Sequence, residues 1–95
     1  MEIRYHWDHD VDLPHIAAHG VNEDEVENVL RDPLENLPGP GNSRITIGTT
    51  LAGRLLKVIC VPDDDRKGVF VVTAYDLVGK PLRAHKRRMR KRGRR

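Results

Sequence analysis

Apolar and polar residues alternate along the middle of the chain, which predicts three β-strands there. The predicted strands cover residues 43–50, 54–61 and 69–75. In the first of them, Ile45 and Ile47 share one face and Arg44 and Thr46 share the other. Short turns connect the three strands, so we expect them to pair as an antiparallel meander. A shorter alternation over residues 2–7 predicts a fourth strand.

The residues that follow Asn22 have the pattern of a helix with a well-defined start. Asn22 is a good N-cap, and Glu25 at the third helical position completes a capping box with it. The helix ends at Asp32, because the residue before a proline avoids helical dihedral angles. Its apolar stripe consists of Val26, Val29 and Leu30.

Two further helices are predicted on either side of these elements. The first ends at His19, with Gly20 as a left-handed stop, and begins near Asp10 or Asp12, so that Pro14 falls in its first turn. The last begins at Pro81 and runs to about Arg92. Residues 37–42 are rich in proline and glycine and are predicted to form a loop.

Together these elements predict a single α+β domain over residues 1–95, with the order β-α-α-β-β-β-α. We expect an antiparallel sheet of about four strands with the helices on one face. Residues 80–95 would form a basic C-terminal helix or tail on this domain.

The composition favours a protein of the reducing cytoplasm. The longest apolar run, residues 58–61, is far too short to cross a membrane, and no apolar signal region follows the first residues. Cys60 is the only cysteine, and its apolar neighbours indicate a small buried hydrophobic residue.

Charge is divided unevenly along the chain. Residues 1–79 carry seven Lys or Arg and fourteen Asp or Glu, whereas residues 80–95 carry ten Lys or Arg and no acid. So much like charge in one segment favours a polyanionic partner such as RNA. The residues expected to bind it are Lys80, Arg83, Lys86, Arg87 and Arg88. A solvated, frayed tail is the alternative.

The histidines and aspartates near the N-terminus invite a metal interpretation, which we do not favour. His15 and His19 share a helical face, but zinc needs three or four convergent ligands, and Pro14 disturbs the local geometry. We therefore expect no metal and no other cofactor. The run Asp63–Asp65 lacks the spaced oxygen ligands of a calcium loop and is expected to be a solvated turn.

Several residues suit a metal-independent ribonuclease. Such an enzyme must position a 2′-hydroxyl, remove its proton and stabilise a charged phosphorane with cations. The residues on or just beyond the predicted meander that offer these groups are Arg44, Arg54, Lys57, Tyr75 and His85. From spacing alone, an ordinary exposed strand position is the better interpretation of each.

Short motifs in a fixed order resemble the BrnT family of toxins. They are Trp7-Asp8, His19-Gly20-Val21, the acidic helix ending in Asp32-Pro33, Arg44-Ile45-Thr46-Ile47-Gly48, Gly53-Arg54-Leu55-Leu56 and Val72-Thr73-Ala74. The chain differs from that family's pattern at Tyr75, Pro81 and His85, where arginine, glutamate and tyrosine are usual. Of the positions that match, Arg44, Arg54 and His19 are candidates for function.

The resemblance implies a RelE-like fold and the ribonuclease toxin of a type II toxin–antitoxin pair, which blocks translation by cutting RNA. Its partners would be RNA and a small DNA-binding antitoxin. Whether the protein also forms a homodimer is left undecided. In this hypothesis Arg44 and Arg54 stabilise phosphate charge, and Tyr75 or His85 transfers protons. The alternative is a non-catalytic RNA-binding or interaction protein of the same fold.

Overall fold

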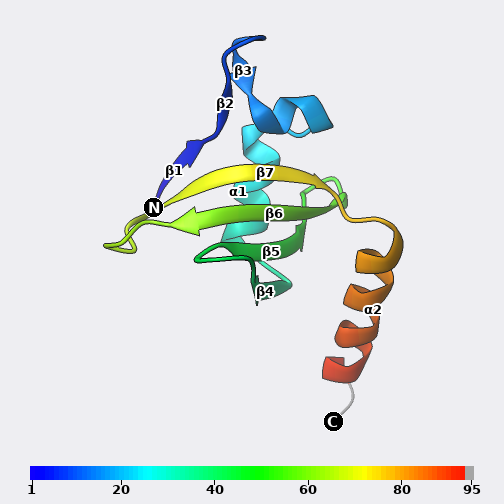
Figure 1. Cartoon of the computed structure of the whole chain (residues 1–95). Coiled ribbons are helices and arrows are strands. Elements are labelled where there is room, and N and C mark those ends of the chain that lie inside the picture. The colour runs from blue at the N-terminus through cyan, green and yellow to red at the C-terminus, as the bar shows by residue number, and fades with distance from the viewer. Residues whose placement is uncertain (94–95) are drawn as a thin grey trace.

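The computed structural model describes residues 1–93, which form a five-stranded sheet with a helix on each side (Figure 1). The sheet has the strand order β1-β7-β6-β5-β4, and a separate two-stranded ribbon consists of β2 and β3. The elements are β1 (Glu2–Tyr5), β2 (Trp7–Asp8), β3 (Leu13–Pro14), the 3₁₀ helix η1 (His15–His19), α1 (Glu23–Arg31), β4 (Glu35–Pro38), β5 (Arg44–Thr49), β6 (Leu55–Pro62), β7 (Gly68–Asp76) and α2 (Gly79–Gly93).

The α+β class and the central meander are confirmed, because β5, β6 and β7 pair antiparallel in sequence. The sheet as a whole is mixed and has five strands, not an antiparallel set of about four. The first strand runs parallel to β7, a direction that side-chain alternation does not encode. The fifth strand, β4, was not predicted, and its last two residues fall in the predicted loop. Pro38 is tolerated there because β4 is an edge strand.

The first predicted helix is much shorter than expected. Residues between Trp7 and Pro14 form the small β2–β3 ribbon, in which Trp7 pairs with Pro14. Only His15–His19 is helical, as a single 3₁₀ segment. Its predicted stop is confirmed, because Gly20 adopts the left-handed conformation with φ 69°. Three acids and a proline therefore mark a turn here, and not the start of an α-helix.

Helix α1 matches its prediction closely. Asn22 and Glu25 form the reciprocal capping box, with hydrogen bonds of 2.9 and 3.0 Å. Val26 and Val29 are fully buried against the sheet, while Leu30 is only partly buried at the margin of this core. The helix approaches β5 so closely that a methyl group on Gly48 would lie 3.2 Å from the side chain of Val29. Figure 1 shows α1 crossing behind the strands.

Helix α2 lies on the other side of the sheet, which corrects the prediction that all helices cover one face. Directly paired residues point to the same side of a sheet, so the register assigns each side chain to a face. Gly48 faces α1, whereas its neighbour Ile47 and the paired Glu35 face the opposite way. Glu35 bonds to His85 of α2. The helix begins at Gly79, two residues before the predicted start at Pro81, which therefore lies in its first turn. Arg94 and Arg95 lie outside the described residues.

The predicted burial of the single cysteine is confirmed. Cys60 is 3% exposed in the core, and burial raises the pKa of its thiol, so it acts as the small buried hydrophobe that was expected. Within residues 1–93 the helices are too short or too polar to span a membrane.

Candidate functional site

One row of side chains crosses the sheet on the face opposite α1. Tyr75 of β7 pairs with Lys57 of β6, Lys57 pairs with Ile47 of β5, and Ile47 pairs with Glu35 of β4. Three strand spacings separate the ends of this row, or roughly 14 Å. Ile47 is buried, so we refer to the surface built on Tyr75 and Lys57 as the open face. It is bounded by η1 at the Tyr75 end and by α2 at the Glu35 end.

Histidines border the open face along the edge of β7. Strand β1 pairs with β7 only as far as Val71, and η1 packs beside the remainder of β7. His19 contacts Tyr75 edge to face, with ring centroids 5.6 Å apart, and His15 contacts His19 at 5.2 Å. On the other side of Tyr75, the Lys57 ammonium lies 5.7 Å from the ring centroid. An imidazole and a cation therefore flank one phenol ring.

None of these three groups is committed to an ion pair elsewhere in residues 1–93. Lys57 and Tyr75 are half-buried, whereas His19 is exposed at the rim. The groups are thus available to an incoming ligand. Binding residues are often held in this way at the margin of a rigid scaffold.

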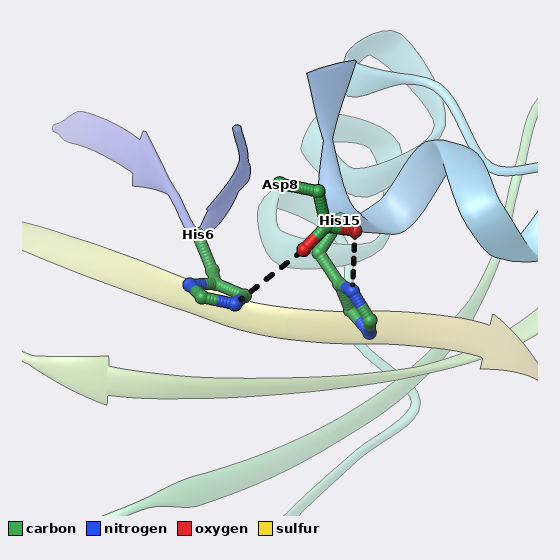
Figure 2. Close-up of side chains that lie close together, drawn as sticks. All are labelled: His6, Asp8 and His15. Carbon is green, nitrogen blue, oxygen red and sulfur yellow. Dashed lines mark hydrogen bonds and ion pairs between the residues drawn. The ribbon is translucent and has the colours of Figure 1, made fainter. Parts of the chain in front are cut away.

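A second polar cluster lies next to this row and consists of His6, Asp8 and His15 (Figure 2). The His15 Nδ1–H donates to the Asp8 carboxylate at 2.9 Å, and His6 Nε2 lies 3.8 Å from the other Asp8 oxygen. The backbone holds the cluster together, because the His15 amide donates to the His6 carbonyl at 2.8 Å. Sequence spacing hides this arrangement, since the β2–β3 ribbon folds two separate segments together.

The opposite boundary of the open face is a triad of His85, Arg88 and the buried Glu35 that docks α2. His85 Nδ1–H donates to Glu35 at 2.6 Å, and Arg88 donates to both oxygens of that carboxylate at 2.6 and 3.0 Å. Glu35 and His85 are 6% and 4% exposed. The hydrogen bond from Arg88 lowers the pKa of Glu35 below its usual value, against the opposing effect of burial. The carboxylate therefore stays charged and fixes the helix on the sheet.

Four of the five predicted RNA-binding residues project from α2 into solvent: Lys80, Arg83, Lys86 and Arg87. Arg88 is half-exposed and is held by Glu35. A groove of about 450 Å³ runs between this helix and the open face and is lined by Thr49, Leu55, Lys86 and Met89 among others. The basic helix and the open face therefore adjoin each other.

The structure does not bring the four predicted catalytic residues together. Arg54 is held on the α1 side of the sheet by Glu25 and by Asp76, whose carboxylate it contacts at 2.7 and 3.1 Å. These bonds lower the pKa of Asp76 and raise that of Arg54. His85 is buried under α2. Both residues therefore have structural partners, which sequence spacing did not indicate.

Arg44 and Tyr75 lie on opposite faces of the sheet. Arg44 pairs with Cys60, whose side chain belongs to the α1-side core, so Arg44 also points that way. It lines a hollow of about 640 Å³ with Asp63, Asp64 and Arg66, where the acids oppose phosphate binding. Tyr75 is the member of the predicted set on the open face. Its structural neighbours are His19, which the resemblance had indicated, and Lys57, which was among the candidate cations.

The fold is an α+β domain with a mixed sheet, an open face that carries Lys57 and Tyr75, and a basic helix at its border. Residues 14–76 match the family model described as a domain of unknown function, DUF4258. The match covers more than half of the chain, so the protein belongs to the DUF4258 family. Neither a curated protein nor a solved structure matches it. The matched segment contains His19, Lys57 and Tyr75, whereas His6, Asp8 and α2 lie outside it.

Proposed function

We propose that this protein is a metal-independent ribonuclease whose active site is the open face. The observation that carries the proposal is the convergence of His19, Tyr75 and Lys57 at the edge of the sheet. These residues come from η1, β7 and β6. They place an imidazole and an ammonium group next to one phenol ring. Those are the groups that RNA transesterification requires.

The reaction divides the proton transfers between two side chains. The His19 imidazole takes the proton of a ribose 2′-hydroxyl, whose oxygen attacks the adjacent phosphorus. The bond from phosphorus to the 5′-oxygen breaks, and the leaving oxygen takes the phenolic proton of Tyr75. Lys57 stabilises the charge that develops on the phosphorane and on the phenolate. The products are a 2′,3′-cyclic phosphate and a 5′-hydroxyl, and the proton returns from His19 to Tyr75 through solvent.

Binding of the substrate is assigned to α2 and to the rings of the open face. The exposed cations Arg83, Lys86 and Arg87 would contact phosphates, while Tyr75 offers a ring on which an unpaired base can stack. The acidic residues are concentrated outside α2, which makes this border the favourable place for a polyanion. Single-stranded RNA lying along α2 would pass over Lys57 and Tyr75.

We further propose the biological setting that the BrnT resemblance implies. In that setting the ribonuclease is the toxin of a type II pair, it blocks translation, and a small DNA-binding antitoxin neutralises it. Its site of action would be the cytoplasm. Support comes from the ordered sequence motifs and from the open face. Induced expression in a bacterial host should arrest growth, and the His19→Gln variant should not.

Purified protein and single-stranded RNA in excess EDTA provide the biochemical test. We expect equal cleavage by the wild type and by His9→Gln. Cleavage by His19→Gln should be slower by about 10²-fold or a larger factor, the usual effect of removing a proton-transfer group. His9 is an exposed histidine that is not among the contacting rings of His15, His19 and Tyr75, and it serves as the matched control. Equal cleavage by both variants, or none by the folded wild type, would contradict the proposal.

One observation favours a non-catalytic RNA-binding protein as the second candidate. Of the four residues that the sequence suggested for catalysis, Arg54 is held in a structural ion pair and His85 in a buried hydrogen bond. A surface with fewer reactive groups would still bind RNA through α2. A mobility shift without cleavage in the EDTA assay would establish this alternative.

A further inference from the structure

We propose that His6, Asp8 and His15 bind one Zn²⁺ ion beside the open face. This site goes beyond the ribonuclease proposal and does not depend on it. One ligand atom from each residue already lies within 4.8 Å of the others. Figure 2 shows both imidazoles directed toward the Asp8 carboxylate.

The distances fit a site that closes by a small movement. Bonds of about 2.0–2.1 Å in a tetrahedral arrangement place neighbouring ligand atoms about 3.3 Å apart. The Asp8 oxygens lie 2.9 Å from His15 Nδ1 and 3.8 Å from His6 Nε2, on either side of that value. His6 is half-exposed, so its ring can rotate toward the ion without disturbing the core.

The backbone around the cluster is pre-organised. The His6 amide donates to the Val71 carbonyl at 2.8 Å, and the His6 carbonyl accepts from the His15 amide at the same distance. Asp8 pairs with Leu13 in the β2–β3 ribbon. The three ligands therefore come from segments whose relative positions are fixed before the ion binds, which limits the entropy lost on binding.

The donor set selects the kind of ion. Two neutral imidazoles and one carboxylate suit borderline transition ions such as Zn²⁺, whereas Mg²⁺ and Ca²⁺ prefer oxygen ligands alone. Residues 5–19 contribute four histidines and three aspartates and no lysine or arginine, so the local charge also favours a cation. Binding requires the proton on His15 Nδ1 to move to Nε2, which replaces the hydrogen bond to Asp8 by coordination.

The reasons against a metal that the sequence offered do not apply to this arrangement. The missing third ligand is supplied from another segment, since His6 and Asp8 precede the turn that leads to His15. Pro14 lies before η1 and not within it, so it leaves the histidine position intact. Solvent access at His6 leaves room for water as a fourth ligand.

Calorimetric titration of the full, metal-free chain with Zn²⁺ tests the site. We expect one ion per chain, no detectable heat with Mg²⁺, and affinity reduced about tenfold or more in His6→Gln, Asp8→Asn and His15→Gln, because loss of even an outer-shell partner costs 10–100-fold. His9→Gln, a neighbouring histidine outside the cluster, should bind as the wild type does.

Absence of Zn²⁺ binding, or equal affinity in all three ligand variants, would overturn the proposal. If the variants do not fold, imidazole NMR signals of the wild type decide the question. Zn²⁺ should shift the ring protons of His6 and His15 and leave those of His9 in place. A shift confined to His9 would show a different site.

Discussion

The rings of Tyr75 and His19 meet edge to face with their centroids 5.6 Å apart, although 56 positions separate them in the sequence. This contact joins η1 to β7 and defines the proposed reaction centre. Removing only the phenolic hydroxyl in Tyr75→Phe should preserve the ring contact and slow RNA cleavage by about 10²–10⁴-fold, the range for loss of a proton-transfer group.

Tyr5→Phe is the matched control for that substitution. Tyr5 lies on the α1 side of the sheet, where its hydroxyl contacts the Glu23 carbonyl at 3.5 Å. Its loss should leave the rate of cleavage unchanged. Equal rates for Tyr75→Phe and wild type, measured on end-labelled RNA, would remove Tyr75 from the mechanism.

Arg54 is predicted to act in stability and not in catalysis. Its guanidinium bonds to Asp76, Glu25 and the Gly20 carbonyl, thereby joining the turn before β6 to the end of β7 and the start of α1. Arg54→Met should lower the free energy of unfolding by about 2–3 kcal/mol, because hydrogen bonds to charged groups are worth about 1.5–3 kcal/mol each and are only partly additive.

Arg54→Lys should recover little of this stability, since an ammonium group cannot reproduce the forked geometry. Arg31→Met provides a control for the loss of a positive charge on an exposed residue. Urea denaturation measures the three variants. If Arg54→Met keeps the stability of the wild type but loses RNA cleavage, Arg54 acts in catalysis and the prediction is wrong.

Acid should release α2 from the sheet. The pKa of Glu35 is lowered in the folded state from the ordinary glutamate value of 4.5, chiefly by the hydrogen bond from Arg88. A carboxyl with a lowered folded-state pKa stabilises the protein fully above its unfolded value, and this contribution is lost as the pH falls through the folded one. Stability should therefore decline below about pH 4.5.

The Glu35→Gln variant should be less stable at neutral pH and should show a flatter decline in acid. Thermal unfolding measured between neutral pH and pH 3 compares it with Glu2→Gln, whose carboxyl is exposed on β1. Identical slopes for Glu35→Gln and wild type would show that the triad does not anchor α2.

Salt dependence separates phosphate contacts from docking contacts on α2. Arg83, Lys86 and Arg87 are exposed, whereas Arg88 is held by Glu35. Replacing the three exposed residues with glutamine should leave the fold intact and reduce the slope of log affinity against log salt by about 0.7 for each lost contact with single-stranded RNA. An unchanged slope in a filter-binding assay would show that RNA does not bind to these residues of α2.

Local patterns in the sequence were sufficient for several elements. The capping box at Asn22, the stop at Gly20 and the meander of β5 to β7 depend on neighbouring residues or on strict alternation, and all three were confirmed. Strand β4 was missed because proline and glycine dominate its surroundings, although an edge strand tolerates Pro38.

The site was harder to predict because it depends on distant pairings. Tyr75 was singled out for its chemistry, but its neighbours His19 and Lys57 come from other elements. The structural role of Arg54 follows from Asp76 and Glu25, which lie 22 and 29 positions away in the sequence. The sequence suggests that His85 is reactive, because it does not show that His85 is buried against Glu35. Sequence spacing contains no information on such contacts.

The central claim, attack by a ribose 2′-hydroxyl at the His19–Tyr75–Lys57 centre, is tested most directly with a pair of oligonucleotides. One is single-stranded RNA, and the other has the same sequence with every 2′-hydroxyl methylated. In EDTA the wild-type protein should bind both and cut only the first, leaving 2′,3′-cyclic phosphate and 5′-hydroxyl ends. Cleavage of the methylated strand, or failure to cut either strand while both are bound, would contradict the account.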